Sequence, residues 1–337
     1  MSRLVVQKYG GSVLRDEDSV RRVARVVAAT AAAGDPVVVV VSALASVTDR
    51  QLERAARFSA GSSTTGAVDL LVATGEIESA SLLALALAEL GVPAEPLNPW
   101  QMGLHTDGAA GGARIVRINP LPLWSRIEAG RVLVVPGFVG RSDDGRLTTL
   151  GRGGSDLTAV ALAGALRAGR CEFFKDVAGY FSADPALVPH ARHCPEITID
   201  EALELARAGC RFLQDRAVEW AASAECRISL HAVDDARTTT IVRRRDGPPR
   251  VVATTHGVAA DGGLGLVSLV GDAAAIRDPA TVRDACEALS AAGIPGRIAS
   301  LTDHRLTVEV PLDRLSESHL LVHDHFFDVA ATPGRPA

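Results

Sequence analysis

Short hydrophobic runs alternate along the first 240 positions with longer stretches in which apolar residues recur every three or four positions. The short runs are rich in valine, which is typical of buried strands, and the longer stretches are typical of helices. Strands are expected at 3–9, 36–42, 131–140, 171–177, 227–233 and 238–244, and helices at 16–33, 49–58, 67–90, from about 155, 199–208 and 214–224. This alternation predicts an α/β fold with a mostly parallel sheet sandwiched by helices.

The hydrophobic pattern changes after residue 242. Residues 243–262 begin with a polar cluster and two prolines, which predicts a linker. Residues 263–330 then show a β-α-β-β-α order, which predicts a small ferredoxin-like α+β unit of a kind that commonly pairs with another copy. We therefore expect a main domain at 1–242 and a small second domain after the linker.

Composition and charge narrow the possible functions. The 337-residue chain has a formal net charge of −5 and no basic tract, so neither nucleic acid nor a membrane is expected as a partner. The longest apolar run, PVVVVVSALA, is too short to cross a bilayer, and no signal peptide is expected. The five cysteines lack close-spaced pairs, which indicates reduced thiols in a cytoplasmic protein rather than disulfides or a zinc site.

The stretch LTTLGRGGSDLTAVALAGAL at 147–166 is a candidate binding site. Its glycines allow backbone N–H groups to approach a ligand, and the helix that begins near Ser155 directs its positive end to the same place. Arg152 adds a planar cation that can bind a carboxylate or a phosphate through two hydrogen bonds. The combination predicts an anion site.

Polar side chains also follow the first two predicted strands. Lys8 ends the first strand and Gly10-Gly11 follow it, so this turn either holds a phosphate or is purely structural. Ser42 and Thr48 follow the second strand, at the sheet edge where ligands bind in α/β folds. Thr48 suits an alternative role equally well, as the N-cap of the next helix.

Two further positions carry charge where it needs an explanation. Glu76 lies in an apolar helical stretch, where a carboxylate is costly unless it is paired, so it could receive a substrate ammonium. Lys175 and Asp176 end another strand and suit a bound nucleotide, although the segment is also typical of an ordinary strand and turn.

Three histidines lie close together near the C-terminus, at His319, His323 and His325. The first two share one helical face at a spacing of four residues, which metal ligands also use. No glutamate lies between them as a general base and no third ligand is evident. We therefore expect a solvated surface and no metal site.

Several motifs occur in a characteristic order: KYGG near the N-terminus, VVVVSA near 40, GE near 75, then PGFVGR, TTLGRGGSD, DVAGYFSADPALVP and RAVEWA. In this order they resemble the aspartate kinases of the amino acid kinase family, over residues 3 to about 235. Residues 263–328 resemble one ACT-type regulatory unit. The resemblance implies the amino acid kinase fold in a catalytic domain, followed by an ACT-like domain through which a homodimer would form.

The resemblance also implies a reaction, the ATP-dependent phosphorylation of the side-chain carboxylate of L-aspartate, with Mg²⁺ as cofactor. Lys8 would hold the transferring phosphate and Asp156 would orient the lysines, and these two are the implied catalytic residues. The implied substrate-binding residues are Ser42, Thr48, Glu76, Arg152, Gly153, Gly154 and Ser155. The implied ATP-binding residues are Gly10, Gly11, Ser12, Lys175, Asp176, Phe181 and Arg211. No strong base would be needed, because a carboxylate is already ionised at neutral pH.

The sequence departs from the family pattern mainly on the nucleotide side. Val13 lacks the hydroxyl of the usual KFGGTS motif, Phe181 replaces a tyrosine and Ala186 replaces an arginine. Arg211 replaces a lysine, and Gln214-Asp215 replace a His-Pro pair. We expect altered ATP affinity and slower turnover, with the substrate contacts retained.

The ACT-like region departs as well. The family usually carries two ACT units and one is expected here, with Pro295 and Gly296 altering the backbone donors that would bind an effector. Weak or absent feedback inhibition by lysine or threonine is therefore expected. Two alternatives stay open, a kinase for a related amino-acid carboxylate and a non-catalytic amino-acid sensor. Retention of Lys8, Arg152 and Asp156 argues against the sensor.

Overall fold

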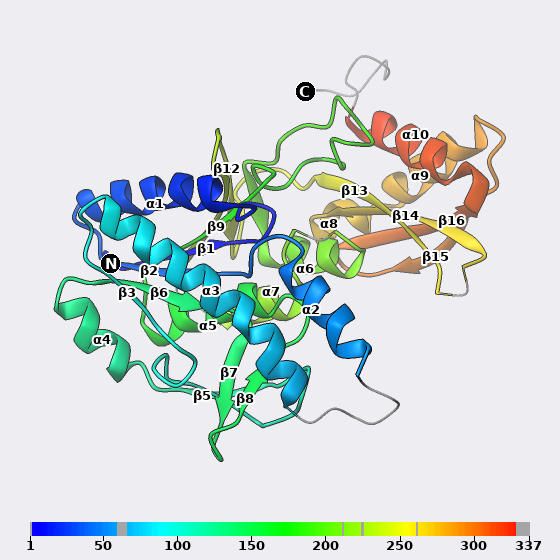
Figure 1. Cartoon of the computed structure of the whole chain (residues 1–337). Helices are drawn as coiled ribbons and strands as arrows, with labels where there is room; N and C mark the ends of the chain where they lie inside the picture. Colours follow the sequence, from blue (N-terminus) through cyan, green and yellow to red (C-terminus); the bar gives the residue numbers. More distant parts are fainter. Residues whose placement is uncertain (1, 59–65, 211, 224–225, 261, 328–337) are drawn as a thin grey trace. The chain divides into compact units, whose positions relative to one another are not determined.

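The computed structural model describes residues 2–58, 66–210, 212–223, 226–260 and 262–327. The chain divides into two compact units (Figure 1). The first is formed within Met1–Ala178 and Arg216–Thr240, and the second within Gly179–Asp215 and Ile241–Ala337.

The first unit is an α/β structure, as the sequence predicts. Its helices are α1 (Glu17–Ala32), α2 (Val47–Ala56), α3 (Ala67–Glu89), α4 (Leu121–Glu128), α5 (Gly154–Ala165) and α7 (Asp215–Ser223). Its main-sheet strands are β1 (Val5–Tyr9), β2 (Val37–Val41), β3 (Ala94–Pro96), β6 (Val132–Pro136), β9 (Arg170–Lys175), β11 (Arg227–Ala232) and β12 (Asp235–Val242). They are ordered β12-β11-β9-β1-β2-β6-β3, and the pairs from β11 to β3 are parallel.

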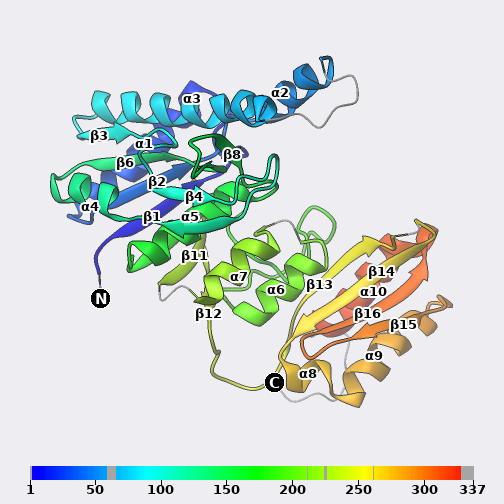
Figure 2. The ribbon, with the colours of Figure 1, turned by 90° about the horizontal axis from the view of Figure 1, so that it is seen from below.

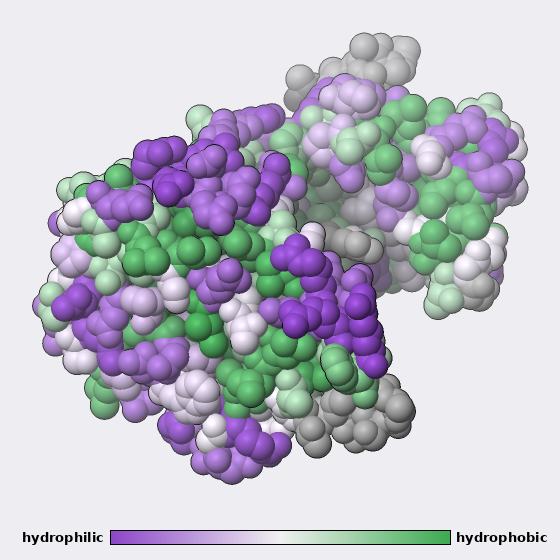
Figure 3. Space-filling model, in the orientation of Figure 1, coloured by the Kyte–Doolittle hydropathy of each residue, from purple (hydrophilic) through white to green (hydrophobic). Residues whose placement is uncertain are grey.

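Helices cover both faces of this sheet because its central strands are buried valine runs. In Figure 2, α1 and α3 lie on one face and α5 lies on the other. The surface over α1 and α2 is mainly hydrophilic in Figure 3, in keeping with the charged residues on the outward side of α1. The carboxyl ends of β1, β2 and β9 are level, since Tyr9 lies beside Val41 and Phe174.

The stretch 131–140, predicted as one strand, is divided in the structure. β6 ends at Pro136, and Phe138 adopts a left-handed conformation with φ of 69° before β7 begins. A Cβ on Gly137 would lie 2.8 Å from the Cβ of Ser155, so this turn packs directly on the start of α5. β7 belongs to a small sheet that was not predicted from the sequence, ordered β5-β4-β7-β8. Its strands are β4 (Leu104–Thr106), β5 (Ile115–Ile118), β7 (Val139–Ser142) and β8 (Leu147–Thr149).

The second unit contains an antiparallel sheet ordered β13-β14-β16-β15. Its strands are β13 (Val251–Val258), β14 (Leu264–Gly271), β15 (Arg297–Leu301) and β16 (Arg305–Pro311). The other elements are β10 (Glu196–Thr198), α6 (Ile199–Arg207), α8 (Ala273–Ile276), α9 (Pro279–Ser290), a 3₁₀ turn at Leu312–Arg314, and α10 (Leu315–Phe327). The predicted β-α-β-β-α order is present. Within the predicted linker 243–262, VVATTHGV has the β-branched composition of a strand and forms β13.

The prediction that the C-terminal histidines lie on a solvated surface is wrong for two of them. His319 and His323 are 2% and 1% exposed. They lie on α10, which packs on β13, and the His319 ring is 3.0 Å from the Thr254 hydroxyl of that strand. His325 is partly exposed.

Helix α3 is long and apolar enough to span a membrane by length and composition alone. In the structure it packs against α1 and β6, and Leu83 and Leu87 are fully buried in the same core cluster as the strand valines. Asp69 and Glu76 are also buried on this helix. These contacts make α3 a core helix of the first unit.

Candidate active site

A cavity of about 430 Å³ lies within the first unit, where the loops after β1 and β2 meet the start of α5. Ligands of open α/β sheets bind at such carboxyl ends of strands. Lys8 and Asp156, the residues expected to be catalytic, both line it. Of the residues expected to bind ligands, its wall contains Gly11, Ser12, Ser42, Thr48, Glu76, Arg152, Gly153, Gly154 and Ser155.

Three charged groups form a cluster that includes two residues of the cavity wall. Lys8 Nζ lies 2.6 Å from Asp156 Oδ1, and Lys175 Nζ lies 3.2 Å from Asp156 Oδ2. Lys8 and Asp156 are 5% and 4% exposed. The two strands β1 and β9 are neighbours in the sheet, so each delivers a lysine to one carboxylate on the first turn of α5.

The protonation of this cluster follows from its burial and its charges. Burial raises the pKa of Asp156, but the charges and hydrogen bonds of Lys8 and Lys175 outweigh it, so the pKa lies below its usual value. Burial lowers the pKa of Lys8, Lys175 lowers it further, and the attraction of Asp156 opposes both. Asp156 is therefore a carboxylate that holds two lysines in place.

The start of α5 supplies backbone donors to the same cavity. Gly151 and Gly153 have φ of 75° and 72°, a conformation that favours glycine, and they bring the chain around to the helix. A Cβ on Gly154 would lie 2.9 Å from both Leu150 and Phe138. Arg152, between these glycines, is exposed and lines the cavity. The arrangement combines a helix N-terminus with a guanidinium, which suits an anion.

Glu76 is the second buried carboxylate of the cavity, at 3% exposed. Its Oε1 accepts a hydrogen bond of 3.2 Å from the Ala43 N–H, and its Oε2 has no partner. Burial raises the pKa of Glu76 to about 7, although the Ala43 N–H and the charge of Lys8 oppose this. Gly75 allows the close approach of α3, because a Cβ there would lie 2.9 Å from Ala43 and from Val47.

Thr48 does not cap α2. The N-cap position is Ser46, which has φ of 63°, and Thr48 lies inside the first turn, partly exposed to the cavity. Thr48 therefore lines the cavity and does not end the helix.

Some residues expected to bind ATP lie elsewhere or are not described. Gly10 adjoins the cluster, since a Cβ there would lie 3.3 Å from Lys8 Nζ. Asp176 is exposed just after β9. Phe181 belongs to the second unit, where it faces His193 across an isolated bridge. Arg211 lies outside the described residues.

Two positioning residues were missed by the sequence analysis. Asp69 on α3 is buried and accepts hydrogen bonds from the Thr149 hydroxyl at 2.9 Å and from the Gly111 N–H at 3.0 Å. Arg216 donates to the carbonyl oxygen of Leu150 at 2.7 Å. Both hold the backbone just before the GRGG turn. The available signals were an acidic residue in an apolar helix and the arginine of RAVEWA.

Comparisons with known proteins identify the family of the unit that contains this cavity. The family profile described as amino acid kinase family matches residues 3–230. An aspartokinase from Mycolicibacterium smegmatis is 41% identical over 270 residues, which are 80% of this chain and 64% of the relative. An aspartokinase from Geobacillus stearothermophilus is 37% identical over 83% of this chain and 68% of the relative.

Solved structures give the same assignment of fold. Aspartokinase III of E. coli in complex with aspartate and ADP superposes with a TM-score of 0.81 at 22% identity, over 96% of this chain and all of that one. Aspartate kinase from Synechocystis gives 0.63 at 31% identity, over 94% of this chain and 54% of that one.

The extent of these matches sets what they establish. The chain spans 64% of the length of the mycobacterial relatives. The family profile covers well over half of the chain and includes every described residue that lines the cavity. The chain therefore belongs to the amino acid kinase family.

Proposed function

We propose that the chain catalyses the ATP-dependent phosphorylation of the side-chain carboxylate of L-aspartate, giving 4-phospho-L-aspartate and ADP. The observation that carries the proposal is a single cavity that contains a buried lysine held by a carboxylate and a second buried carboxylate with an unpartnered oxygen. The relatives named aspartokinases, and the similar structure that holds aspartate and ADP, support the same reaction.

The amino-acid end of the substrate has two charged groups to satisfy. Arg152 binds the α-carboxylate through paired hydrogen bonds, and Glu76 accepts the α-ammonium. The ammonium gives a hydrogen-bond partner to Glu76 Oε2, for which the described protein groups supply none. It also favours the ionised form of a carboxyl whose pKa is raised by burial. Ser42 and Thr48, in the same wall, add hydroxyl groups.

The phosphoryl end lies at Lys8 and the start of α5. A side-chain carboxylate oxygen of aspartate forms a bond to the γ-phosphorus, and the bond from that phosphorus to the bridging oxygen of ADP breaks. Lys8 and the helix N–H groups stabilise the charge on the transferring oxygens, and Asp156 keeps Lys8 in position. The nucleophile needs no general base, because the carboxylate is ionised at neutral pH.

The cavity favours Mg²⁺ that enters with the nucleotide. The carboxylates in its described wall are Asp49, Glu76 and Asp156, and Asp156 is paired with two lysines. They do not form a cage of oxygen ligands. Mg²⁺ usually keeps several waters and binds through substrate phosphates, where it neutralises charge. We also assign Gly10, Gly11, Ser12, Lys175 and Asp176 to the nucleotide side.

A hydroxamate assay tests the reaction directly, because hydroxylamine traps an acyl phosphate. The chain is incubated with ATP, Mg²⁺ and, in separate reactions, L-aspartate, L-glutamate and aspartate analogues. Product with L-aspartate alone supports the proposal. If hydroxamate forms only with another amino acid, that amino acid is the substrate in place of L-aspartate. If hydroxamate forms with none of them, the chain is a non-catalytic homologue.

We propose further that the second unit is ACT-like, mediates a homodimer and gives weak feedback inhibition in a cytoplasmic enzyme. Ile298 and Leu301 support the dimer, because they are 45% and 49% exposed on the edge strand β15. Light scattering measures the dimer. Strong inhibition by millimolar lysine, threonine or both would contradict the weak feedback inhibition. The altered affinity for ATP is a separate expectation, and a low Michaelis constant for ATP would contradict it.

A further inference from the structure

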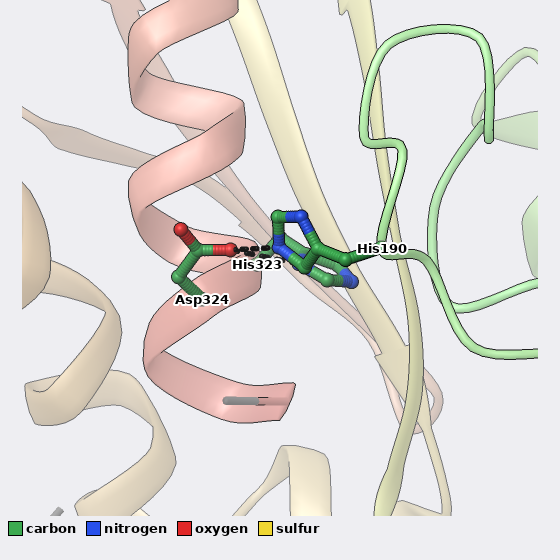
Figure 4. Close-up of side chains that lie close together, drawn as sticks. All are labelled: His190, His323 and Asp324. Atoms are coloured by element: carbon green, nitrogen blue, oxygen red, sulfur yellow. Dashed lines mark hydrogen bonds and ion pairs between the residues drawn. The ribbon is translucent and has the colours of Figure 1, made fainter. Parts of the chain in front are cut away.

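The second unit contains a cluster of metal-ligating side chains that the proposed kinase reaction does not use. His323 and Asp324 lie near the end of α10, and His190 lies in the segment between Ser182 and Arg192 (Figure 4). One ligand atom from each of the three lies within 4.8 Å of the others. All three belong to the same compact unit.

One carboxylate oxygen of Asp324 contacts both rings, which lie on the same side of it (Figure 4). This oxygen, Oδ1, lies 2.7 Å from His190 Nε2 and 3.1 Å from His323 Nδ1 (Figure 4). In a tetrahedral zinc site with bonds of about 2.0–2.1 Å, neighbouring ligand atoms are about 3.3 Å apart. The two pairs that include Asp324 are near this spacing and the third lies within 4.8 Å, so rotations of exposed side chains can gather the three atoms around an ion.

We propose that His190 Nε2, His323 Nδ1 and Asp324 Oδ1 bind a divalent transition-metal ion, with Zn²⁺ as the preferred ion. Two imidazoles and one carboxylate form a donor set typical of Zn²⁺, and the nitrogen ligands disfavour Mg²⁺ and Ca²⁺. The His190 and Asp324 side chains are 52% and 37% exposed, so the ion can enter from solvent and keep a water as its fourth ligand.

The surroundings of His323 orient it for this role. Its Nε2 lies 2.9 Å from the hydroxyl of Ser182, which leaves Nδ1 facing Asp324. Metal-bound histidines usually hold their second nitrogen in this way. The last turn of a helix also carries partial negative charge, and Asp324 and the adjacent His323 lie near the end of α10.

Ser182, His323 and Asp324 are connected by hydrogen bonds in the order found in serine hydrolases, but the geometry argues against a hydrolase. Ser182 is 1% exposed, and its hydroxyl oxygen accepts a hydrogen bond of 2.8 Å from the Arg192 N–H. A nucleophile in that place has no access to a substrate. Ser182 instead positions His323 and ties it to the segment that carries His190.

The test measures zinc binding by the full chain without a histidine tag, after removal of metals with a chelator. Calorimetry with ZnCl₂ gives affinity and stoichiometry, and Co²⁺ substitution gives a visible spectrum that reports the ligand set. The variants are His190→Ala and Asp324→Asn. His325→Ala is the matched control, because it removes a histidine from the same helix outside the cluster.

We expect one high-affinity Zn²⁺ per chain. Either cluster variant weakens it by more than the 10- to 100-fold that loss of an outer hydrogen-bond partner costs, and the control leaves it unchanged. Absence of binding, or equal binding by all three variants and the parent chain, would overturn the site. None of these outcomes depends on kinase activity, so the proposed function is tested separately.

Discussion

The two units bury ionisable side chains in opposite ways. In the first unit, Glu76 is a buried acid whose neutral form is favoured, with a pKa raised by burial to about 7. In the second unit, His319 is a buried base whose neutral form is favoured, with a pKa lowered to about 4 by burial and by the nearby His256. The acid lies beside an open cavity and a lysine, whereas the base lies between a helix and a strand. Glu76 therefore lies where a charged ligand can reach it, whereas His319 is packed against other protein groups.

The largest expected effect comes from Lys8, the buried lysine of the cavity wall whose Nζ lies 2.6 Å from Asp156. Lys8→Ala should lower kcat about 10²- to 10³-fold, the usual cost of removing one group that stabilises transition-state charge. The hydroxamate rate at saturating substrates measures this. Activity above a tenth of the parent level would mean that Lys8 does not contact the transferring phosphate.

Glu76 is expected to reduce stability as pH rises. The carboxyl ionises near pH 4.5 in the unfolded chain but only near 7 in the folded one, so ionisation favours unfolding between these values. The folded protein should lose up to about 3 kcal/mol across this window relative to Glu76→Gln. Urea unfolding of both proteins from pH 4.5 to 7.5 measures the difference. Parallel curves would contradict the raised pKa.

The same substitution sharpens the assignment of Glu76 to the substrate. Loss of its charge should raise the Michaelis constant for aspartate about 10- to 100-fold, as expected for a hydrogen bond to a charged group. The constant for ATP should stay the same. A change confined to ATP would move Glu76 to the nucleotide side.

His319 is expected to act in the opposite direction. Its ring binds a proton near pH 6.5 in the unfolded chain but near 4 in the folded one, so stability is lost as pH falls through this window. Between pH 7 and 4.5 the loss relative to His319→Gln should be about 2 kcal/mol. Unfolding of the two proteins at pH 4.5 and 7 measures it. An equal loss in both would assign the acid sensitivity to other groups.

The smallest effect is expected for an exposed charge on α1. Arg21 is 52% exposed and lies 3.5 Å from both Asp18 and Glu89. Arg21→Ala should change the free energy of unfolding by less than about 1 kcal/mol, since exposed ion pairs contribute little. It should leave the hydroxamate rate unchanged, so it serves as the control for Lys8→Ala. A larger loss of stability would mean that an exposed charge can contribute as much as the buried Glu76 and His319.

The cavity was predictable because its parts are encoded locally. Lys8 lies one residue before the end of a buried strand, and the GRGG turn leads into a helix, so each motif carries its own backbone geometry. The parallel order of the strands then brings these ends together. Glu76, the acidic residue in the apolar stretch of α3, also lies in the cavity wall.

The features that were missed depend on contacts between distant segments. Asp69 holds Thr149 across 80 positions, and Arg216 holds Leu150 across 66. His323 was taken as solvated because nothing in its own helix reveals that Ser182, 141 positions earlier, covers it. Short strands such as β4 and β8 have three residues each, too few for a hydrophobic period to be recognised.

Asp156 has a consequence for the resting protein. By sharing its two oxygens between Lys8 and Lys175, it leaves the trio with one net positive charge in place of two. Two buried lysines without a counter-ion would bind small anions from the solvent, such as chloride, and these would compete with the substrates. With Asp156 as counter-ion, the three groups carry a single positive charge. A polyanion is attracted to that charge more strongly than a monovalent ion is.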